Sequence, residues 1–130
     1  MEINWLAVLA AAVSSFVLGG AWYSALFAKA WQNAAGLSDE QIKNGNMGLI
    51  FGGSFVLALI ASASFAVFLG GQVDAMTGAL YGLTAGLCWV SASFGINYLF
   101  ERKSLTLFLI NGGYHTLQFT LIGLILGAWH

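Results

Sequence analysis

Charged side chains are scarce in this chain. Only 7% of the 130 residues are Asp, Glu, Lys or Arg, whereas 59% are hydrophobic and the mean hydropathy is +0.84. An ordinary globular domain has about a quarter charged residues, so the composition excludes a water-soluble domain as the body of the protein. It indicates an integral membrane protein whose main partner is the lipid bilayer.

Other absences exclude further classes. The chain has only four basic residues, too few for a nucleic-acid-binding surface. It has one cysteine, Cys88, so no internal disulfide can form. We find no catalytic pair of carboxylates, no Ser-His-Asp constellation, no P-loop and no dinucleotide fingerprint. A histidine without a second ligand at suitable spacing is poor evidence for a metal or haem. We therefore expect no enzyme activity, no catalytic or metal-binding residues and no cofactor.

Four apolar runs lie between the charged residues, at about 3–27, 47–69, 76–100 and 105–129. Each run is long enough to cross a bilayer as a helix, and none alternates as a barrel strand would. The sequence thus predicts an all-α integral membrane protein, a compact bundle of four transmembrane helices forming one domain over residues 1–130.

The connection at 28–46 is the only sizeable polar segment. Within it, "LSDEQIKNG" offers Ser38 as an N-cap and Gln41 three residues later, the pattern of a capping box. We expect a short capped helix in this loop.

The basic residues are distributed unevenly over the connections. Lys29 and Lys43 follow the first run, Arg102 and Lys103 follow the third, and the second connection, "GGQVDAM", has none. By the positive-inside rule, the first and third connections face the cytoplasm. The sequence therefore predicts a multi-pass protein with both termini outside and a cytoplasmic loop at 28–46.

Small residues recur at every fourth position in several runs. The clearest ridge is Gly78, Gly82 and Gly86 in the third run. Lipid gives apolar helices no hydrophobic reason to associate, so close backbone approach through small residues has to supply much of the packing. We expect these ridges to be helix contacts.

A short internal similarity suggests a repeat. "LIFGGS" at 49–54 aligns with "LINGGY" at 109–114, each near the start of an even-numbered run. Two parallel-repeated helical hairpins, at about 1–71 and 72–130, would place such segments alike, as in some transporters.

Polar side chains interrupt the fourth run along one face. At 100° per residue, Asn111, Tyr114, His115 and Gln118 fall within an arc of roughly 100°. His115 would lie near the midplane of the membrane. The third run offers a complementary face, so the sequence predicts a polar seam between the two runs, whose third-run members are Tyr81, Thr84, Cys88 and Ser91, extended by Asn97 and Tyr98.

Two interpretations of this stripe stay open. The polar groups can be interhelical hydrogen bonds, worth about 0.6 kcal/mol each on average. Alternatively, a titratable side chain at the midplane marks a solute path or a proton relay. No acidic residue lies in any apolar run, so coupling through a buried carboxylate is not expected.

The opening "INWLAVLAAAVSSFVLGGAWYSALFAKAW", the "GLSDEQIK" after it and the closing "FLINGGYHTLQFTLIGLILGAW" resemble a bacterial membrane family catalogued as domain of unknown function 1761. The resemblance covers almost the whole chain. Its most specific positions are Trp22, Tyr23, Ser24, Phe27, Lys29, Trp31, Asn111, Gly113, Tyr114 and His115.

This resemblance implies a four-span bundle in a bacterial inner membrane and supplies no activity. Relatives typically have proline after the Trp-Tyr-Ser triplet, where this chain has Ala25 and no proline anywhere, so the residue that would kink the helix there is missing. A cavity leading inward past Tyr23 toward His115 would join the two family-like segments.

Two functions follow from these observations. The first is a small homo-oligomeric channel or carrier for an ion or small solute, favoured by the polar stripe and the repeat. The second is a non-catalytic accessory or structural subunit of a larger membrane complex, favoured by the lack of charge within the runs and of a soluble domain.

Overall fold

The computed structural model describes residues 2–130, which contain helices and no strand. In chain order the segments are α1 (Trp5–Gly20), η1 (Ala21–Leu26), α2 (Ala28–Ala35), α3 (Asp39–Lys43), α4 (Met47–Leu69), α5 (Ala75–Thr84), η2 (Ala85–Ser91), α6 (Ala92–Glu101) and α7 (Leu105–Ala128). The two η segments are π-helical. The predicted all-α fold is confirmed, because long helices fill the four apolar runs.

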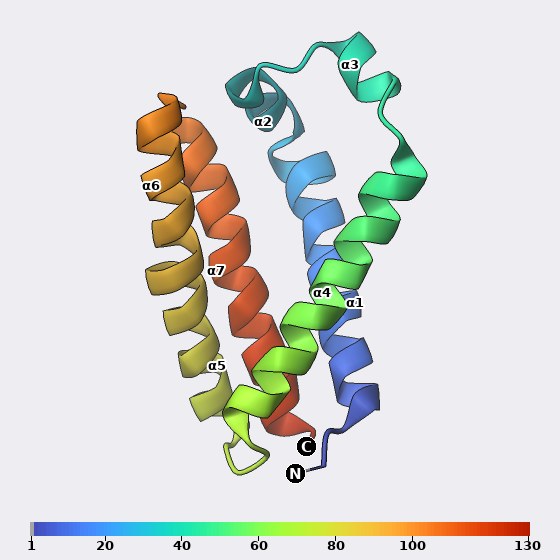
Figure 1. The fold of residues 1–130 in the computed structure, drawn as a ribbon, viewed down its shortest axis with the longest axis vertical. Helices are drawn as coiled ribbons and strands as arrows, with labels where there is room; N and C mark the ends of the chain where they lie inside the picture. The colour runs from blue at the N-terminus through green and yellow to red at the C-terminus, as the bar shows by residue number, and fades with distance from the viewer. Residues whose placement is uncertain (1) are drawn as a thin grey trace.

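Three continuous helices are long and apolar enough to cross a membrane: α1 with η1, α4, and α5 with η2 and α6. The fourth, α7, has 24 residues and no charged side chain, but its polar stripe lowers its hydropathy and it is not among the three. Figure 1 shows α7 between α1 and the α5–α6 rod, with α4 crossing in front. The long helix that carries the polar stripe is therefore the one surrounded by the others.

Side-chain caps mark the start of each long helix. Asn4, Asn46, Asp74 and Ser104 each accept a hydrogen bond from a backbone N–H in the first turn of α1, α4, α5 and α7. Such caps satisfy donors that have no acceptor within the helix. At Asp74 the Thr77 N–H donates at 2.8 Å, and this bond holds the pKa of the exposed carboxyl below its usual range.

The apolar core lies at the end of the bundle that holds both termini (Figure 1). Val8 of α1, Phe65 of α4 and Ile122 of α7 meet there, each less than 7% exposed. The rings of Phe65 and Phe119 lie 5.8 Å apart, edge to face. Hydrocarbon contacts among α1, α4 and α7 hold this half of the bundle together.

Glycine brings the α5–η2 segment against the α7 backbone. A Cβ atom at Gly82 would overlap the carbonyl oxygen of Phe119, and one at Gly78 would overlap that of Gly123. A Cβ at Gly86 would lie 2.5 Å from the carbonyl oxygen of His115. The small-residue ridge predicted in the third run is thus confirmed as a helix contact.

A break separates the first span from α2 without proline. The chain is π-helical over Ala21–Leu26, where the Phe27 N–H donates to the Trp22 carbonyl at 2.9 Å, and Phe27 then leaves helical geometry with φ −127° and ψ 20°. A kink is therefore present at this point, with a π-helical turn as its local cause.

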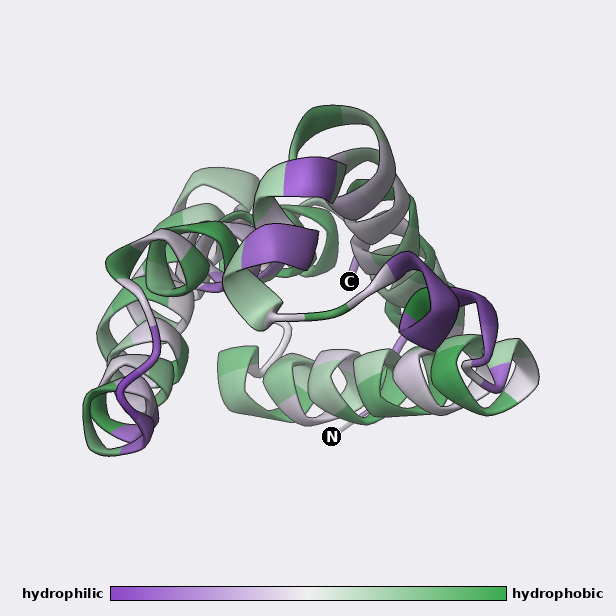
Figure 2. Cartoon of the chain, turned by 90° about the horizontal axis from the view of Figure 1, so that it is seen from above, coloured by the Kyte–Doolittle hydropathy of each residue, from purple (hydrophilic) through white to green (hydrophobic). Residues whose placement is uncertain are grey.

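The connections opposite the termini hold all four basic residues: Lys29, Lys43, Arg102 and Lys103. Figure 2 looks onto this end and shows hydrophilic residues on the connections, with apolar residues along the long helices. The capping box predicted at Ser38 and Gln41 is confirmed at the start of α3. We refer to this part of the molecule as the basic end.

The internal repeat stays a prediction. The two similar segments lie near the basic-end starts of α4 and α7, but their surroundings differ. Nothing lies within 4 Å of a Cβ built at Gly52 or Gly53, whereas Gly112 faces Ser91 and Gly113 faces the Trp22 ring.

Candidate functional site

The polar stripe of α7 lies in the half of the bundle nearer the basic end. Asn111, Tyr114 and His115 are half-buried, and Gln118 is only 7% exposed. The stripe is completed by two side chains from other helices, and we call the whole set the polar cluster: Tyr23, Tyr98, Asn111, Tyr114, His115 and Gln118.

Asn111 joins three helices through its amide group. The Tyr23 hydroxyl in η1 donates to its Oδ1 at 2.6 Å, and its Nδ2 donates to the Tyr98 hydroxyl of α6 at 2.7 Å. An amide is suited to this position because it is both an acceptor and a donor. Asn111 thus closes a chain of hydrogen bonds across the bundle from the first span to the third.

Two further hydrogen bonds, each from a side chain to a backbone carbonyl, join the first span to α7. Trp22 Nε1 donates to the Ile110 carbonyl at 2.8 Å, and the indole fits because Gly113 has no side chain there. The Tyr114 hydroxyl donates to the Ser15 carbonyl of α1 at 3.0 Å. Long polar side chains, rather than close backbone contact, hold α1 to α7 in this half.

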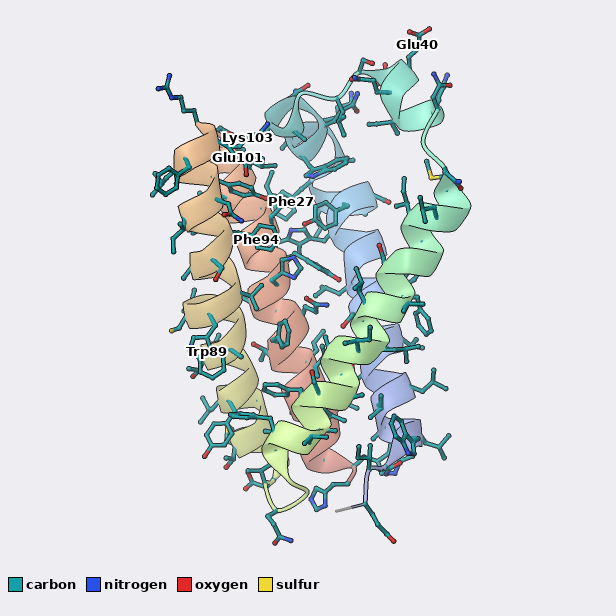
Figure 3. All side chains as sticks on the ribbon, viewed as in Figure 1. Phe27, Glu40, Trp89, Phe94, Glu101 and Lys103 are labelled. Carbon is teal, nitrogen blue, oxygen red and sulfur yellow. The ribbon has the colours of Figure 1, made fainter. Side chains whose placement is uncertain are left out.

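His115 lies between aromatic rings from two helices. Its ring stacks on Phe94 of α6, with centroids 5.0 Å apart and planes at 10°, and Tyr114 meets it edge to face at 4.8 Å. Figure 3 shows Phe94 on the side of α6 that faces α7. His115 Nδ1 lies 2.7 Å from Gln118 Oε1.

The contact with Gln118 fixes which ring nitrogen of neutral His115 carries the proton. An amide oxygen only accepts, so Nδ1 carries the proton and donates, which makes Nε2 the acceptor nitrogen of neutral imidazole. Among residues 2–130 no side-chain hydrogen bond involves Nε2. The cluster therefore holds one histidine nitrogen that can accept a hydrogen bond.

The predicted seam with the third run is wrong in most of its members. Tyr81, Thr84, Cys88 and Asn97 are exposed, with Tyr81 against Phe68 and Thr84 bonded to the Leu80 carbonyl of its own helix. Only Ser91 and Tyr98 reach α7.

Ser91 contacts the small-residue face of α7 rather than the polar stripe. Its buried hydroxyl lies 2.8 Å from the Gly112 carbonyl, 2.7 Å from the Gly86 carbonyl and 3.2 Å from the Thr116 hydroxyl. The physical cause is the η2 segment. A π-helix has more residues per turn than an α-helix, so faces assigned at 100° per residue lose their phase across Ala85–Ser91.

The family-like segment divides into inward and outward residues. Trp22 and Tyr23 contact α7 as described, and the Trp31 ring of α2 packs edge to face on Tyr23 at 5.7 Å. Ser24 and Lys29 are exposed. A direct bond between Tyr23 and Asn111 therefore stands where a cavity between the two segments was expected.

Phe94 is the residue of this site that sequence reasoning missed. It stacks on His115 and lies 5.6 Å from the Tyr98 ring. Its spacing of four from Tyr98 within α6 was the available signal. For metals, residues 2–130 contain no group of three or more His, Cys, Asp or Glu side chains placed to share an ion.

The fold and the site define a multi-pass α-helical membrane protein with a polar cluster inside one half of its bundle. The model of the family described as protein of unknown function (DUF1761) matches residues 6–127. The chain therefore belongs to this family. Neither the comparison with curated proteins nor that with solved structures gives a match.

Proposed function

We propose that this protein is a small homo-oligomeric channel or carrier for an ion or a small polar solute, with the polar cluster forming part of the path. The observation that carries the proposal is the His115–Gln118 pair. It places a histidine nitrogen with no side-chain partner among residues 2–130 next to a buried amide, inside an apolar bundle. Polar groups at such a depth are costly and commonly mark solute or proton pathways.

The hydrogen bonds of Asn111 would close the path between the His115–Gln118 pair and the basic end. Separating Tyr23 and Tyr98 from Asn111 breaks two side-chain bonds, each worth about 0.6 kcal/mol on average in a membrane. A total of about 1 kcal/mol is small enough for a solute with modest preference for the open form to offset. The apolar core and the glycine contacts at the other end would stay fixed.

Self-association is part of the proposal, because four short helices rarely enclose a pore alone. The apolar face of α4, with Leu49, Leu57 and Ile60 at 59–71% exposure, is available to a second copy or to lipid. We place the protein in the bacterial inner membrane with the basic end in the cytoplasm and both termini outside, as the positive-inside rule favours.

One observation favours the alternative, an accessory subunit of a larger membrane complex. Both the oxygen and the nitrogen of the Asn111 amide already have partners within the chain. In that case the polar cluster would serve helix packing alone, and the exposed apolar faces would contact partner subunits.

The test begins with gentle extraction from the native membrane, native electrophoresis and mass spectrometry of the band. We expect a band containing only copies of this chain, whereas a defined set of other proteins would support the accessory role. The purified protein is then reconstituted in liposomes, and the fluxes of protons and small solutes are compared with those of His115→Ala.

Asn97→Ala is the matched control, since it removes an exposed polar side chain from α6. We expect at least one flux that His115→Ala abolishes and Asn97→Ala retains. Absence of any flux above that of empty liposomes, or equal flux for both variants, would overturn the transport proposal.

A further inference from the structure

A groove between α6 and α7 opens at the basic end. It has a volume of about 400 Å³, and the apolar side chains that line it include Ile96, Leu99, Leu105 and Phe108. The Phe108 ring packs onto Gly95, where an added Cβ would lie 2.9 Å from it.

The mouth of the groove is polar and positively charged. Lys103 and Ser104 line it, and Arg102 is the adjacent residue in the loop between the two helices. The α7 helix begins here, and Ser104 caps the N–H of Leu107, so the first N–H groups of α7 add partial positive charge at the same place.

The apolar part of the groove faces the surroundings of the bundle rather than its core. Leu99 and Leu105 are 81% and 71% exposed, and in a membrane these surfaces contact lipid chains. The groove thus has apolar walls next to a basic mouth at the level of the headgroups.

We propose that the groove binds one anionic phospholipid of the leaflet at the basic end, with an acyl chain along α6 and α7 and the phosphate at Lys103 and the start of α7. Charge complementarity selects this occupant, because basic residues at a membrane surface attract anionic headgroups. The proposal requires only that the chain spans a membrane, so it stands independently of transport.

A Glu101 variant is expected to change lipid binding in the opposite direction to a Lys103 variant. Figure 3 shows Glu101 and Lys103 near each other at the end of α6. The Glu101 carboxylate repels a phosphate at this position. Removing the Glu101 charge should therefore strengthen lipid binding, and removing the Lys103 charge should weaken it.

The experiment titrates the purified full-length chain in detergent with phosphatidylglycerol or phosphatidylcholine and measures bound lipid by native mass spectrometry. We expect phosphatidylglycerol to be retained more strongly. Lys103→Gln should weaken its binding about fivefold, the effect of about one surface charge, and Glu101→Gln should tighten it. Lys43→Gln, on the other basic connection, is the matched control and should leave binding unchanged.

A second variant tests the apolar part of the groove. Ala92 is exposed and lines the groove, so Ala92→Phe fills it while leaving every charge in place. We expect loss of bound phosphatidylglycerol with an unchanged free energy of unfolding. Equal retention of the two lipids, equal weakening by Lys43→Gln and Lys103→Gln, or unchanged binding in Ala92→Phe would each overturn the proposal.

Discussion

At the scale of single residues, the polar cluster depends on one amide that serves two neighbours of different helices. Asn111 accepts from Tyr23 and donates to Tyr98, so each of its polar atoms has a partner. A carboxylate at this position would be an acceptor only, and a hydrocarbon side chain would leave both tyrosine hydroxyls without this contact. The side chain at position 111 must therefore both accept and donate a hydrogen bond to keep these two contacts.

Tyr23→Phe removes one donor of this chain of bonds and leaves the aromatic ring. We expect the free energy of unfolding to fall by about 0.6 to 1.7 kcal/mol, from the average to the maximum measured for interhelical hydrogen bonds in a membrane protein. Unfolding in mixed micelles with increasing dodecyl sulfate measures it. Tyr81→Phe is the control, because Tyr81 is 47% exposed, and an equal loss in both variants would contradict the role of Tyr23.

The α7 members of the site could be predicted from sequence, but most of their partners could not. Four polar residues in an uncharged run share a face by simple helical geometry. The partners of these residues depend on which faces of the neighbouring helices point toward α7. One extra residue in a π-helical turn changes which of the residues after it lie on a given face. Ser91 follows Gly86 on the contact face at a spacing of five rather than four, because both residues lie within the π-helical η2 segment. Constant 100° spacing therefore grouped Ser91 with the exposed face of Thr84 and Cys88, although Ser91 contacts α7.

At the scale of the helices, two kinds of contact hold α7. Glycine allows α5 to touch its backbone near the termini, while side-chain hydrogen bonds and stacked rings join it to η1 and α6 near the basic end. The first kind tolerates almost no added volume, whereas the second kind can exchange partners. The ridge was predictable because close packing in lipid requires small residues.

Gly82→Ala tests the first kind of contact. The added methyl group would meet the Phe119 carbonyl, which belongs to the backbone and cannot rotate away. We expect a loss of about 1–3 kcal/mol in the free energy of unfolding, as for overpacked cores.

Gly52→Ala in α4 is the matched control, since nothing lies within 4 Å of its added Cβ. It should be neutral or stabilising by up to about 1 kcal/mol through helix propensity. Similar losses from both substitutions would show that α5 and α7 are not in this close contact.

At the scale of the whole molecule, the two ends of the bundle differ in chemistry. The end with the termini has the apolar core, and the opposite end has every Lys and Arg of the chain. This division follows from sequence alone, because the charged residues delimit the runs and their order fixes which connections share an end. The splaying of α4 away from α6 near the basic end (Figure 1) does not, since it depends on which side chains face each other.

Cysteine labelling tests the proposed orientation. With Cys88→Ser as background, Gln72→Cys reports the connection between α4 and α5, and Glu40→Cys reports α3. In spheroplasts, we expect a membrane-impermeant maleimide to label Gln72→Cys and to reach Glu40→Cys only after the membrane is permeabilised. Labelling of Glu40→Cys in intact spheroplasts with protection of Gln72→Cys would mean the inverted orientation.

The two π-helical segments also bear on how this family can vary in length. A π-helical turn accommodates one residue more than an α-helical turn without shifting the faces on either side. A relative with one residue fewer between Gly86 and Ser91 would restore regular α-helix there, and both residues would still face α7. The same holds at Ala21–Leu26 before the break. Single-residue insertions and deletions in the first and third spans are therefore expected to concentrate at these two turns, while α4 and α7 keep a constant length.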